Sequence, residues 1–305
     1  MTASAERALA DGTRFLLEMQ APAGCWRDFE VDRADESDAW VTGYVGTALA
    51  AVAAATGWDL GGAVAAARAF LLCAAAERPG WGFNGDAPPD ADSTAWATLM
   101  LAASGGAPAL AYGALRTHRR PDGGFSTYVR FSDPSMWEQS QADVSAAALQ
   151  ALAQERGADR ADLAATGDYL RAAQRPDGSW PSYWYATPLY ALVHALHALA
   201  ASDASAAGAP AAAALSFARA QGVPDDDAFA LALLAELEAC FGDGRAGQLR
   251  DALIALQRAD GRWTAGRPFM RPDPWKYAPG DPDAAIVDKY GLFTTATVLR
   301  ALCRA

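Results

Sequence analysis

The sequence predicts an all-α protein, an (α/α)6 barrel in which six helical hairpins close into an inner and an outer ring. Alanine runs dominate the chain, as in 48–55, 63–76 and 195–214, and alanine is the best helix former. Isoleucine, which favours strands, occurs only at Ile254 and Ile286. A repeated turn then separates the helices at intervals of about 40 to 60 residues, enough for two helices and their loops. An open helical solenoid is the alternative architecture that this pattern leaves.

The repeated turn has the form Gln-x-x-x-Gly-x-aromatic and follows the apolar end of a helix. Because its Pro, Asp and Gly residues stop helices, each copy is expected to end one helix and turn the chain. Of the six copies, the one that begins at Gln221 is the weakest and has no aromatic residue. The copies begin at Gln20, Glu77, Arg119, Gln174, Gln221 and Gln257. The aromatic position of the five clearer copies is predicted at residues 26, 83, 125, 180 and 263.

A second helix is expected soon after each turn, behind a short polar residue. Such a side chain accepts a hydrogen bond from a free backbone N–H and stabilises the helix by ~1 kcal/mol. An N-cap role of this kind explains several aspartates without any catalysis. The inner helices point their positive ends at the barrel mouth. A ring of these carboxylates at the mouth therefore also suits the binding of Mg²⁺ together with a diphosphate. The predicted starts are Asp38, Asp92, Asp143, Thr187, Asp227 and Thr294.

Length, composition and charge exclude several classes of protein. With 305 residues, 52% hydrophobic and 20% charged, the chain is not disordered and is long enough for a large core. We interpret 1–305 as one barrel domain, with the loop-rich segment 264–290 as a lid. The net charge of −11 argues against nucleic acid and against anionic membranes as partners. No apolar run predicts a membrane span, and four scattered cysteines indicate reduced thiols and a cytoplasmic location.

The repeated turn resembles the QW motif of the class II terpene cyclases, the family that includes the squalene–hopene and oxidosqualene cyclases. The Gly123-Gly124-Phe125 variant is also similar to repeats in protein prenyltransferase β subunits. The resemblance covers the chain from about residue 12 to residue 302. It implies the barrel fold, with the Gln tying helix ends and the Trp packing on the neighbouring hairpin. It also implies a place in terpenoid biosynthesis, as part of secondary metabolism.

The segment Asp90-Ala91-Asp92-Ser93-Thr94 resembles the acid motif of that family, Asp-x-Asp-Asp-Thr, and still more its Asp-x-Asp-Thr-Thr variant. The resemblance implies that Asp92, at the third position, is the general acid. Ser93 departs from the family pattern at the fourth position, where oxidosqualene cyclases also lack an Asp. We expect Asp90 to tune the acid, and Ser93 or Thr94 to orient its proton.

The residues themselves suit this chemistry. Protonating an alkene needs a carboxylic acid that stays neutral near pH 7, whereas the pKa of a free Asp is about 3.9. Burial and a neighbouring carboxylate both raise the pKa. Aromatic faces stabilise the resulting carbocation by ~0.5–2 kcal/mol per contact. The predicted substrate site therefore consists of Trp40, Tyr44, Trp96, Phe125, Trp184 and Tyr190, together with Asp38 and Asp143.

The predicted substrate is an apolar polyene or a prenyl diphosphate. Mg²⁺ is expected only with a diphosphate, no metal ligands are predicted, and the candidates for anion binding are Arg271, Lys276 and Lys289. Larger enzymes of the family place their site between two barrels, which leaves room here for a homodimer or a partner protein that completes the site.

Other functions fit the same barrel. One is a non-catalytic binder of an apolar ligand or a partner protein. Another is a glycoside-active enzyme that uses two carboxylates. Zinc-dependent prenyl transfer is disfavoured, because none of the four cysteines stands in an Asp-x-Cys arrangement with a downstream His.

Overall fold

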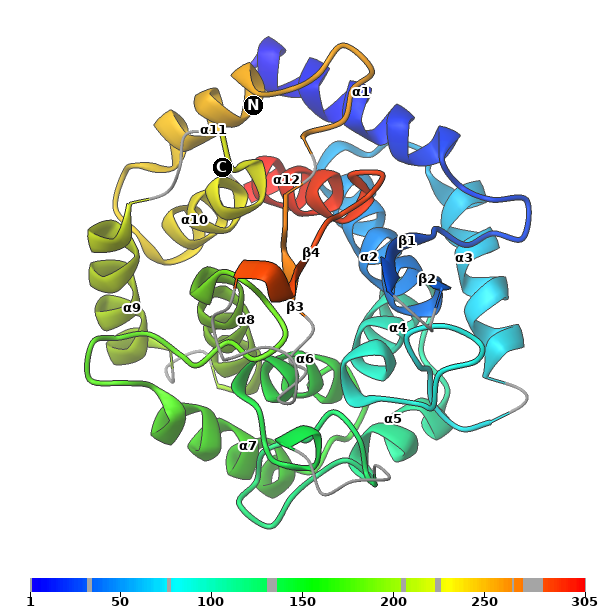
Figure 1. Ribbon diagram of the computed structural model, residues 1–305, viewed down its shortest axis with the longest axis vertical. Coiled ribbons are helices and arrows are strands. Elements are labelled where there is room, and N and C mark those ends of the chain that lie inside the picture. Colours follow the sequence, from blue (N-terminus) through cyan, green and yellow to red (C-terminus); the bar gives the residue numbers. More distant parts are fainter. Residues whose placement is uncertain are drawn as a thin grey trace.

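The computed structural model describes residues 2–31, 35–75, 78–130, 136–203, 207–222, 226–264, 266–270 and 282–304. Within them, twelve α-helices alternate between two concentric rings (Figure 1). The outer helices are α1 (Ala3–Glu18), α3 (Gly61–Ala74), α5 (Ala109–Arg116), α7 (Arg160–Ala173), α9 (Gly208–Gln221) and α11 (Ala246–Ala255). The inner helices are α2 (Ala39–Thr56), α4 (Ala91–Ala103), α6 (Ala142–Leu152), α8 (Pro188–Ser202), α10 (Ala228–Phe241) and α12 (Leu292–Arg304).

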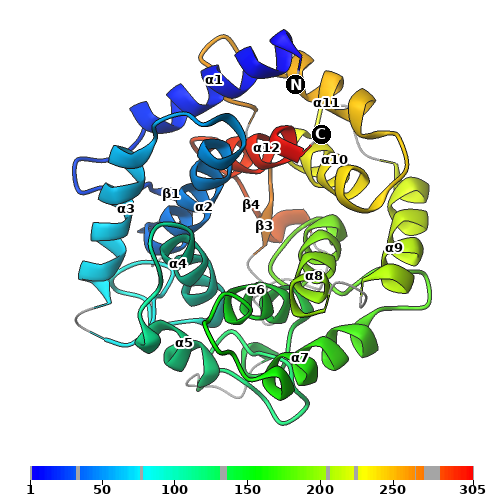
Figure 2. The ribbon, with the colours of Figure 1, turned by 180° about the vertical axis from the view of Figure 1, so that it is seen from behind.

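The inner ring is closed. Each inner helix packs against the next one in chain order, and α12 packs against α2. The same closed ring is seen from behind in Figure 2. The predicted (α/α)6 barrel is therefore confirmed, and the open solenoid is excluded.

The inner helices are buried on nearly all sides, because the outer ring covers one face and the barrel centre covers the other. Helix α2 is an example. Among the described helices it is the one that is long and apolar enough to cross a membrane by length and composition alone. However, 61% of its 18 residues are buried inside the barrel, as expected for a core helix.

Each strict copy of the repeated turn ties two hairpins together. The Gln174 amide donates to the carbonyls of Gly178 (3.1 Å) and Pro210 (3.0 Å), and the Trp180 indole N–H donates to Leu170 (2.7 Å). Gly178 has a φ of +92°, and a Cβ there would lie 2.3 Å from the Ala213 carbonyl oxygen. The copies at Gln20 and Gln257 make the same set of contacts. The turn therefore fixes the approach of each outer helix to the next.

The second copy departs from the predicted frame. Trp81, and not Phe83, donates its indole N–H to the carbonyl ten residues earlier, Leu71 (2.9 Å), as Trp180 does to Leu170. The reason is the position of the glycine, because the positive-φ Gly80 directly precedes Trp81, whereas Gly178 stands two residues before Trp180. Phe83 therefore does not occupy the aromatic position of the turn, and its ring packs on Trp40 in the barrel centre.

The predicted start of α4 was wrong by two residues. Asp38, Thr187 and Asp227 do cap their helices as predicted. In α4, however, the N-cap is Asp90, and Asp92 lies in the first turn. Carboxylates suit both positions, since each meets the positive end of the helix, so the pattern alone did not separate them.

Helices α6 and α12 also begin earlier than predicted. Helix α6 follows Gln141, which places Asp143 in the first turn. Helix α12 begins at Leu292, so Thr294 lies inside it. The buried Asp288 accepts hydrogen bonds from the Phe293 and Thr294 amides and takes the capping role instead.

Short hairpins stand at the barrel mouth. Strand β1 (Asp28–Val31) pairs antiparallel with β2 (Asp35–Ser37), and β3 (Phe269–Met270) pairs antiparallel with β4 (Ala285–Ile286). Single 3-10 turns are η1 (Met136–Glu138) and η2 (Pro282–Ala284). Figure 1 shows β3 and β4 across the centre of the ring. They belong to the predicted lid, 264–290, of which residues 265 and 271–281, with Arg271 and Lys276, lie outside the described residues.

Candidate active site

Asp92 presents one carboxyl oxygen that has no partner. The side chain lies in the first turn of α4 and is 8% exposed. The Tyr185 hydroxyl donates to its Oδ2 at 3.0 Å, whereas Oδ1 is buried and accepts no hydrogen bond within the described part of the chain. The Trp40 indole N–H is likewise buried and meets no acceptor at full hydrogen-bond geometry within the described residues, although it lies close enough to Asp92 to lower its pKa as a hydrogen-bond donor does. An acceptor and a donor are thus left open side by side.

The surroundings of Asp92 favour its neutral form. Burial raises its pKa well above the usual value, because a charge is poorly solvated in the barrel. The carboxylates of Asp90 and Asp143 raise it further by repulsion. The hydrogen bond from Tyr185 and the nearby Trp40 act in the opposite direction and do not outweigh burial. The net direction is the one that an acid catalyst needs.

Asp90 and Ser93 form a cap and not a proton relay. One Asp90 oxygen accepts from the Ser93 amide (2.8 Å) and the other from the Ser93 hydroxyl (2.7 Å). Burial raises the Asp90 pKa to about 6, although these two hydrogen bonds lower it. The Thr94 hydroxyl donates to the Trp81 carbonyl. Both hydroxyls are therefore directed away from Asp92, which leaves Tyr185 as its hydrogen-bond donor.

The other two predicted acidic residues have different environments. Asp143 is fully buried, and its Oδ2 accepts from the amides of Tyr183 (2.7 Å) and Trp184 (2.8 Å). It therefore anchors the loop that leads to Tyr185. Asp38 is half-buried at the start of α2, where its side chain accepts from the Ala39 amide. Asp143 borders the acid, and Asp38 remains at the rim.

Aromatic rings fill the barrel between the mouth and the inner helices. Tyr44 lies 4.5 Å from Trp96 and 3.7 Å from Phe293 between ring centroids, and the Trp96 indole donates to the Tyr190 hydroxyl at 3.1 Å. Trp40 and Tyr185, which flank Asp92, belong to the same contact network. We name it the aromatic cluster, and it consists of Phe29, Trp40, Tyr44, Phe83, Trp96, Trp184, Tyr185, Tyr190, Phe229, Phe269 and Phe293.

Five of the six predicted aromatic residues lie in this cluster. Phe125 is the exception. It occupies the frame position of its turn, and among the described residues its ring contacts the Arg119 guanidinium, 5.4 Å away, and no other ring. Sequence reasoning did not select Phe269, which stands in the loop-rich lid segment, or Phe293, which only ring closure brings next to Tyr44. The signal for Tyr185 was present, because it lies in the aromatic run that follows a strict turn.

A buried ion pair lies behind the cluster. The Arg300 guanidinium stands 5.4 Å from the Tyr44 ring and 5.5 Å from the Trp96 ring, and it pairs with Glu236 at 3.1 Å. Burial would raise the Glu236 pKa, but Arg300 and His197 hold it well below the usual range. The deep side of the cluster therefore carries a compensated charge and not a free acid.

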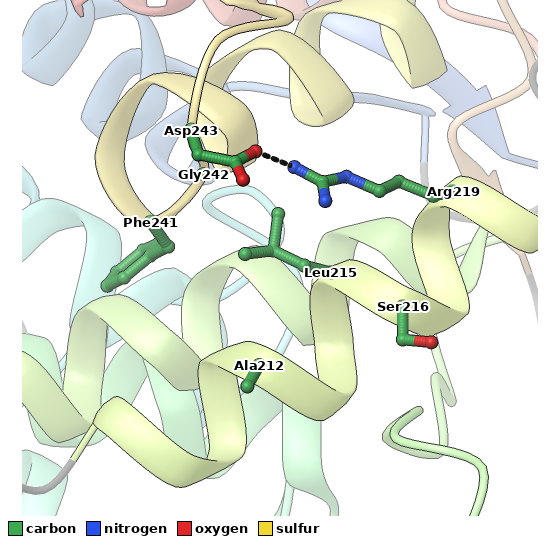
Figure 3. Close-up of a pocket in the computed structure, with 7 residues that line it drawn as sticks. All are labelled: Ala212, Leu215, Ser216, Arg219, Phe241, Gly242 and Asp243. Atoms are coloured by element: carbon green, nitrogen blue, oxygen red, sulfur yellow. Dashed lines mark hydrogen bonds and ion pairs between the residues drawn. The ribbon is translucent and has the colours of Figure 1, made fainter.

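A surface pocket of about 430 Å³ lies elsewhere, between α9 and the end of α10 (Figure 3). It shares no residue with the aromatic cluster. Its charged group, Arg219, is already paired with Glu238 and with Asp243 (2.7 Å each). The pocket offers no reactive group and is not the candidate site.

Comparisons with known proteins bear on the fold that holds this site. No protein-family model and no curated protein matches the chain. The type II terpene cyclase MstE from Scytonema is 26% identical, with a TM-score of 0.83, over 100% of this chain and 99% of that chain. The chain has a class II terpene-cyclase-like fold. A variant of the same cyclase, in complex with geranylgeranyl dihydroxybenzoate as substrate, is 27% identical with a TM-score of 0.83, over 99% of this chain and 97% of that chain.

A larger enzyme shares this class II cyclase fold. The ent-copalyl diphosphate synthase from Streptomyces platensis is 23% identical with a TM-score of 0.62, over 87% of this chain and 50% of that chain. At that identity the likeness concerns the fold alone. The resemblance to class II terpene cyclases that the repeated turns indicated is thus confirmed over the whole barrel.

Proposed function

We propose that the protein is a class II terpene cyclase that starts ring closure by protonating a prenyl chain with Asp92. The observation that carries the proposal is the buried carboxyl of Asp92, with one oxygen unpaired, beside the aromatic cluster. Because Tyr185 donates to Oδ2, the acidic proton is left to Oδ1. An unpaired buried oxygen is costly in a mere packing position, but it is required of a group that delivers a proton.

The reaction follows from this arrangement. The O–H bond of Asp92 breaks as its proton forms a C–H bond with the terminal alkene, and a tertiary cation remains. The electron pair of the next double bond attacks that cation and forms a ring C–C bond. The last cation loses a proton to a water molecule and Asp92 takes one back from solvent, so substrate and product have the same formula. The faces of Trp40, Tyr44 and Trp96 stabilise the moving charge, and their packing excludes water that would quench it.

The substrate is proposed to be a prenyl chain that ends in a neutral or aromatic head group. The solved cyclase that holds geranylgeranyl dihydroxybenzoate supports this, because nearly its whole length matches this one barrel. The same match supports a site that needs no partner protein. At the mouth, Lys289 is paired with Glu30 (2.8 Å) and Glu36 (3.1 Å), so it is not free to hold a diphosphate. The described residues contain no cluster of three or more His, Cys, Asp or Glu side chains suited to a metal.

The alternatives are weaker on specific grounds. A glycoside-active enzyme needs two available carboxyl groups. In this site both oxygens of Asp90 accept from Ser93, and Asp143 is occupied by backbone amides, which leaves Asp92 alone. A non-catalytic binder gains nothing from an unpaired buried carboxyl oxygen. We also propose a cytoplasmic location, supported by four free cysteines; cell fractionation tests it.

The test is a product screen by mass spectrometry on the purified protein. Geranyl, farnesyl and geranylgeranyl diphosphates, squalene and a geranylgeranylated dihydroxybenzoate are offered with and without Mg²⁺. We expect a cyclised isomer of one substrate, and a ~10²–10⁴-fold lower rate in Asp92→Asn because the amide holds no acidic proton. The matched control is Asp227→Asn, the same change at the start of α10, which should keep full activity. Equal rates in Asp92→Asn and wild type would refute the proposal.

A further inference from the structure

Strand β3 forms backbone hydrogen bonds with residues 184–186, the loop that carries Tyr185 to the acid. The Met270 amide donates to the Trp184 carbonyl (2.6 Å), and the Ala186 amide donates to the Pro268 carbonyl (3.0 Å). Tyr185 and Phe269 form an antiparallel bridge between them. The segment 184–186 is therefore held against β3 by an isolated antiparallel bridge, although the two are far apart in the sequence.

The same segment positions the hydrogen-bond partner of Asp92. Its central residue is Tyr185, whose hydroxyl donates to Asp92 Oδ2 and whose ring stacks on Tyr190. On its N-terminal side, Asp143 holds the Trp184 amide. On its C-terminal side, the hydrogen bond of Ala186 goes to β3. A change in β3 is thus expected to reach Tyr185 through both flanks of the segment, whereas Asp143 still holds its N-terminal side.

The Phe269 ring packs against the aromatic side chains around the acid. It is 8% exposed and stacks on Trp184, with 5.7 Å between centroids and 5° between planes. It also lies 5.1 Å from Trp40 and 6.4 Å from Tyr185, the two side chains that flank Asp92. A prenyl chain that reaches Asp92 must therefore lie against Phe269 or displace it.

The segment that follows β4 is fastened independently of Phe269. Lys289 pairs with Glu30, and the Tyr290 hydroxyl donates to Glu36 at 2.8 Å, both on the β1–β2 hairpin. The Tyr290 amide donates to the buried Asp28. These contacts do not involve Phe269, so a variant at that position is expected to keep the hairpin at the mouth.

We propose that Phe269 is a positioning and size-determining residue of the site: it holds Tyr185 on Asp92 and limits the bulk of the substrate beside the acid. The size limit rests on the proposed cyclase function, whereas the contact between Phe269 and the 184–186 segment does not. The groups that shift the Asp92 pKa are Asp90 from its own helix, Asp143 from α6, Trp40 from α2 and Tyr185 from the loop. The hydroxyls of Tyr190 from α8 and Tyr44 from α2 also feel the Asp92 charge. Of these, Tyr185 is the one that is paired with β3.

The first test needs no turnover. Hydrogen exchange is measured by mass spectrometry on the full chain, on peptides that cover 183–187, for wild type, Phe269→Ala and Ile286→Ala. Ile286 is the partly buried β4 partner of Phe269, and its ring-free side chain makes it the matched control. We expect exchange at the Ala186 amide to rise about tenfold in Phe269→Ala and to stay near wild type in Ile286→Ala. Unchanged exchange in Phe269→Ala would overturn the positioning role.

The second test uses the substrate that the wild type converts. Loss of the Tyr185 hydrogen bond raises the Asp92 pKa, so the alkaline limb of the kcat profile should move to higher pH in both Tyr185→Phe and Phe269→Ala. Entry of water alone would move it to lower pH, and that result overturns the proposal.

Phe269→Ala should also accept bulkier prenyl chains, and Phe269→Leu should restore part of the wild-type selectivity. An unaltered substrate range in Phe269→Ala contradicts the size limit. If the wild type converts no substrate, the cyclase function fails, and the exchange measurement still decides the positioning role.

Discussion

Asp90 and Asp92 show how two residues of the same type, two positions apart, acquire different chemistry from the helix on which they stand. Asp90 is outside the first turn and accepts two hydrogen bonds from Ser93. Asp92 is inside the turn and points away from those donors, so one of its oxygens stays unpaired. The sequence indicated both residues through their motif. It did not indicate that Ser93 serves Asp90, because that depends on which residue begins the helix.

The exchange of Asp90 for Asn tests whether its charge tunes the acid. Asn keeps an oxygen for the N-cap, so near pH 4, where burial keeps Asp90 neutral in the folded chain, the free energy of unfolding should change by less than about 1 kcal/mol. Because the Asp90 carboxylate raises the Asp92 pKa, its removal should lower that pKa and move the alkaline limb of the kcat profile to lower pH. The pH profile of kcat is also measured for Asp227→Asn as the control, and its alkaline limb should not move. An unshifted limb in Asp90→Asn would mean that burial alone tunes Asp92.

At the scale of elements, the sequence predicted the hairpins well because the turns are local. The Gln amide bonds a carbonyl four residues away, and the Trp indole bonds one ten residues away, so the spacing is visible in the chain. The two-residue strands β3 and β4 have no such pattern. Their pairing depends on the loop at 184–186 and on the closed ring around them, and neither is encoded in the neighbouring residues.

The turn at Gly178 gives a prediction about stability. In Gly178→Ala the new Cβ meets the Ala213 carbonyl oxygen at 2.3 Å, and the φ of +92° is itself strained for alanine. We expect a loss of more than about 2 kcal/mol in the free energy of unfolding by urea. Gly157→Ala is the matched control, because its φ is +75° with no atom within 4 Å, and it should cost only about 1 kcal/mol. Equal losses in the two variants would show that the approach of α9 to the turn is not tight.

At the scale of the whole molecule, ring closure makes the site. Phe293 from the last helix and Tyr44 from the first inner helix stack at 3.7 Å because α12 packs against α2. Trp40, Trp96 and Tyr190 were predictable, since each follows the start of an inner helix by a few residues and therefore lies near the mouth. The rest of the cluster required the closed barrel.

The whole barrel should be most stable in mildly acidic solution. Burial raises the pKa values of Asp90, Asp92, Asp143 and Asp288 in the folded chain, and that of Asp90 reaches about 6 from 3.8. Between these values the folded state binds more protons than the unfolded state, so stability falls as the pH rises; Asp90 alone contributes ~3 kcal/mol to this fall. Below about pH 4 stability should fall again as the pH drops. Glu236 has a lowered pKa in the folded chain, so its protonation costs stability.

Thermal unfolding between pH 4 and pH 8 checks this, and the melting temperature should be highest near pH 4 and decline toward pH 8. The net charge of −11 acts in the same direction, since self-repulsion grows as carboxyls ionise. Asp90→Asn separates the two causes: it removes the Asp90 titration but only one of many acidic charges, so the slope between pH 5 and pH 7 should flatten clearly. A melting temperature that rises toward pH 8 would mean that the buried carboxyls are ionised in the folded barrel, and Asp92 would then have no proton to give.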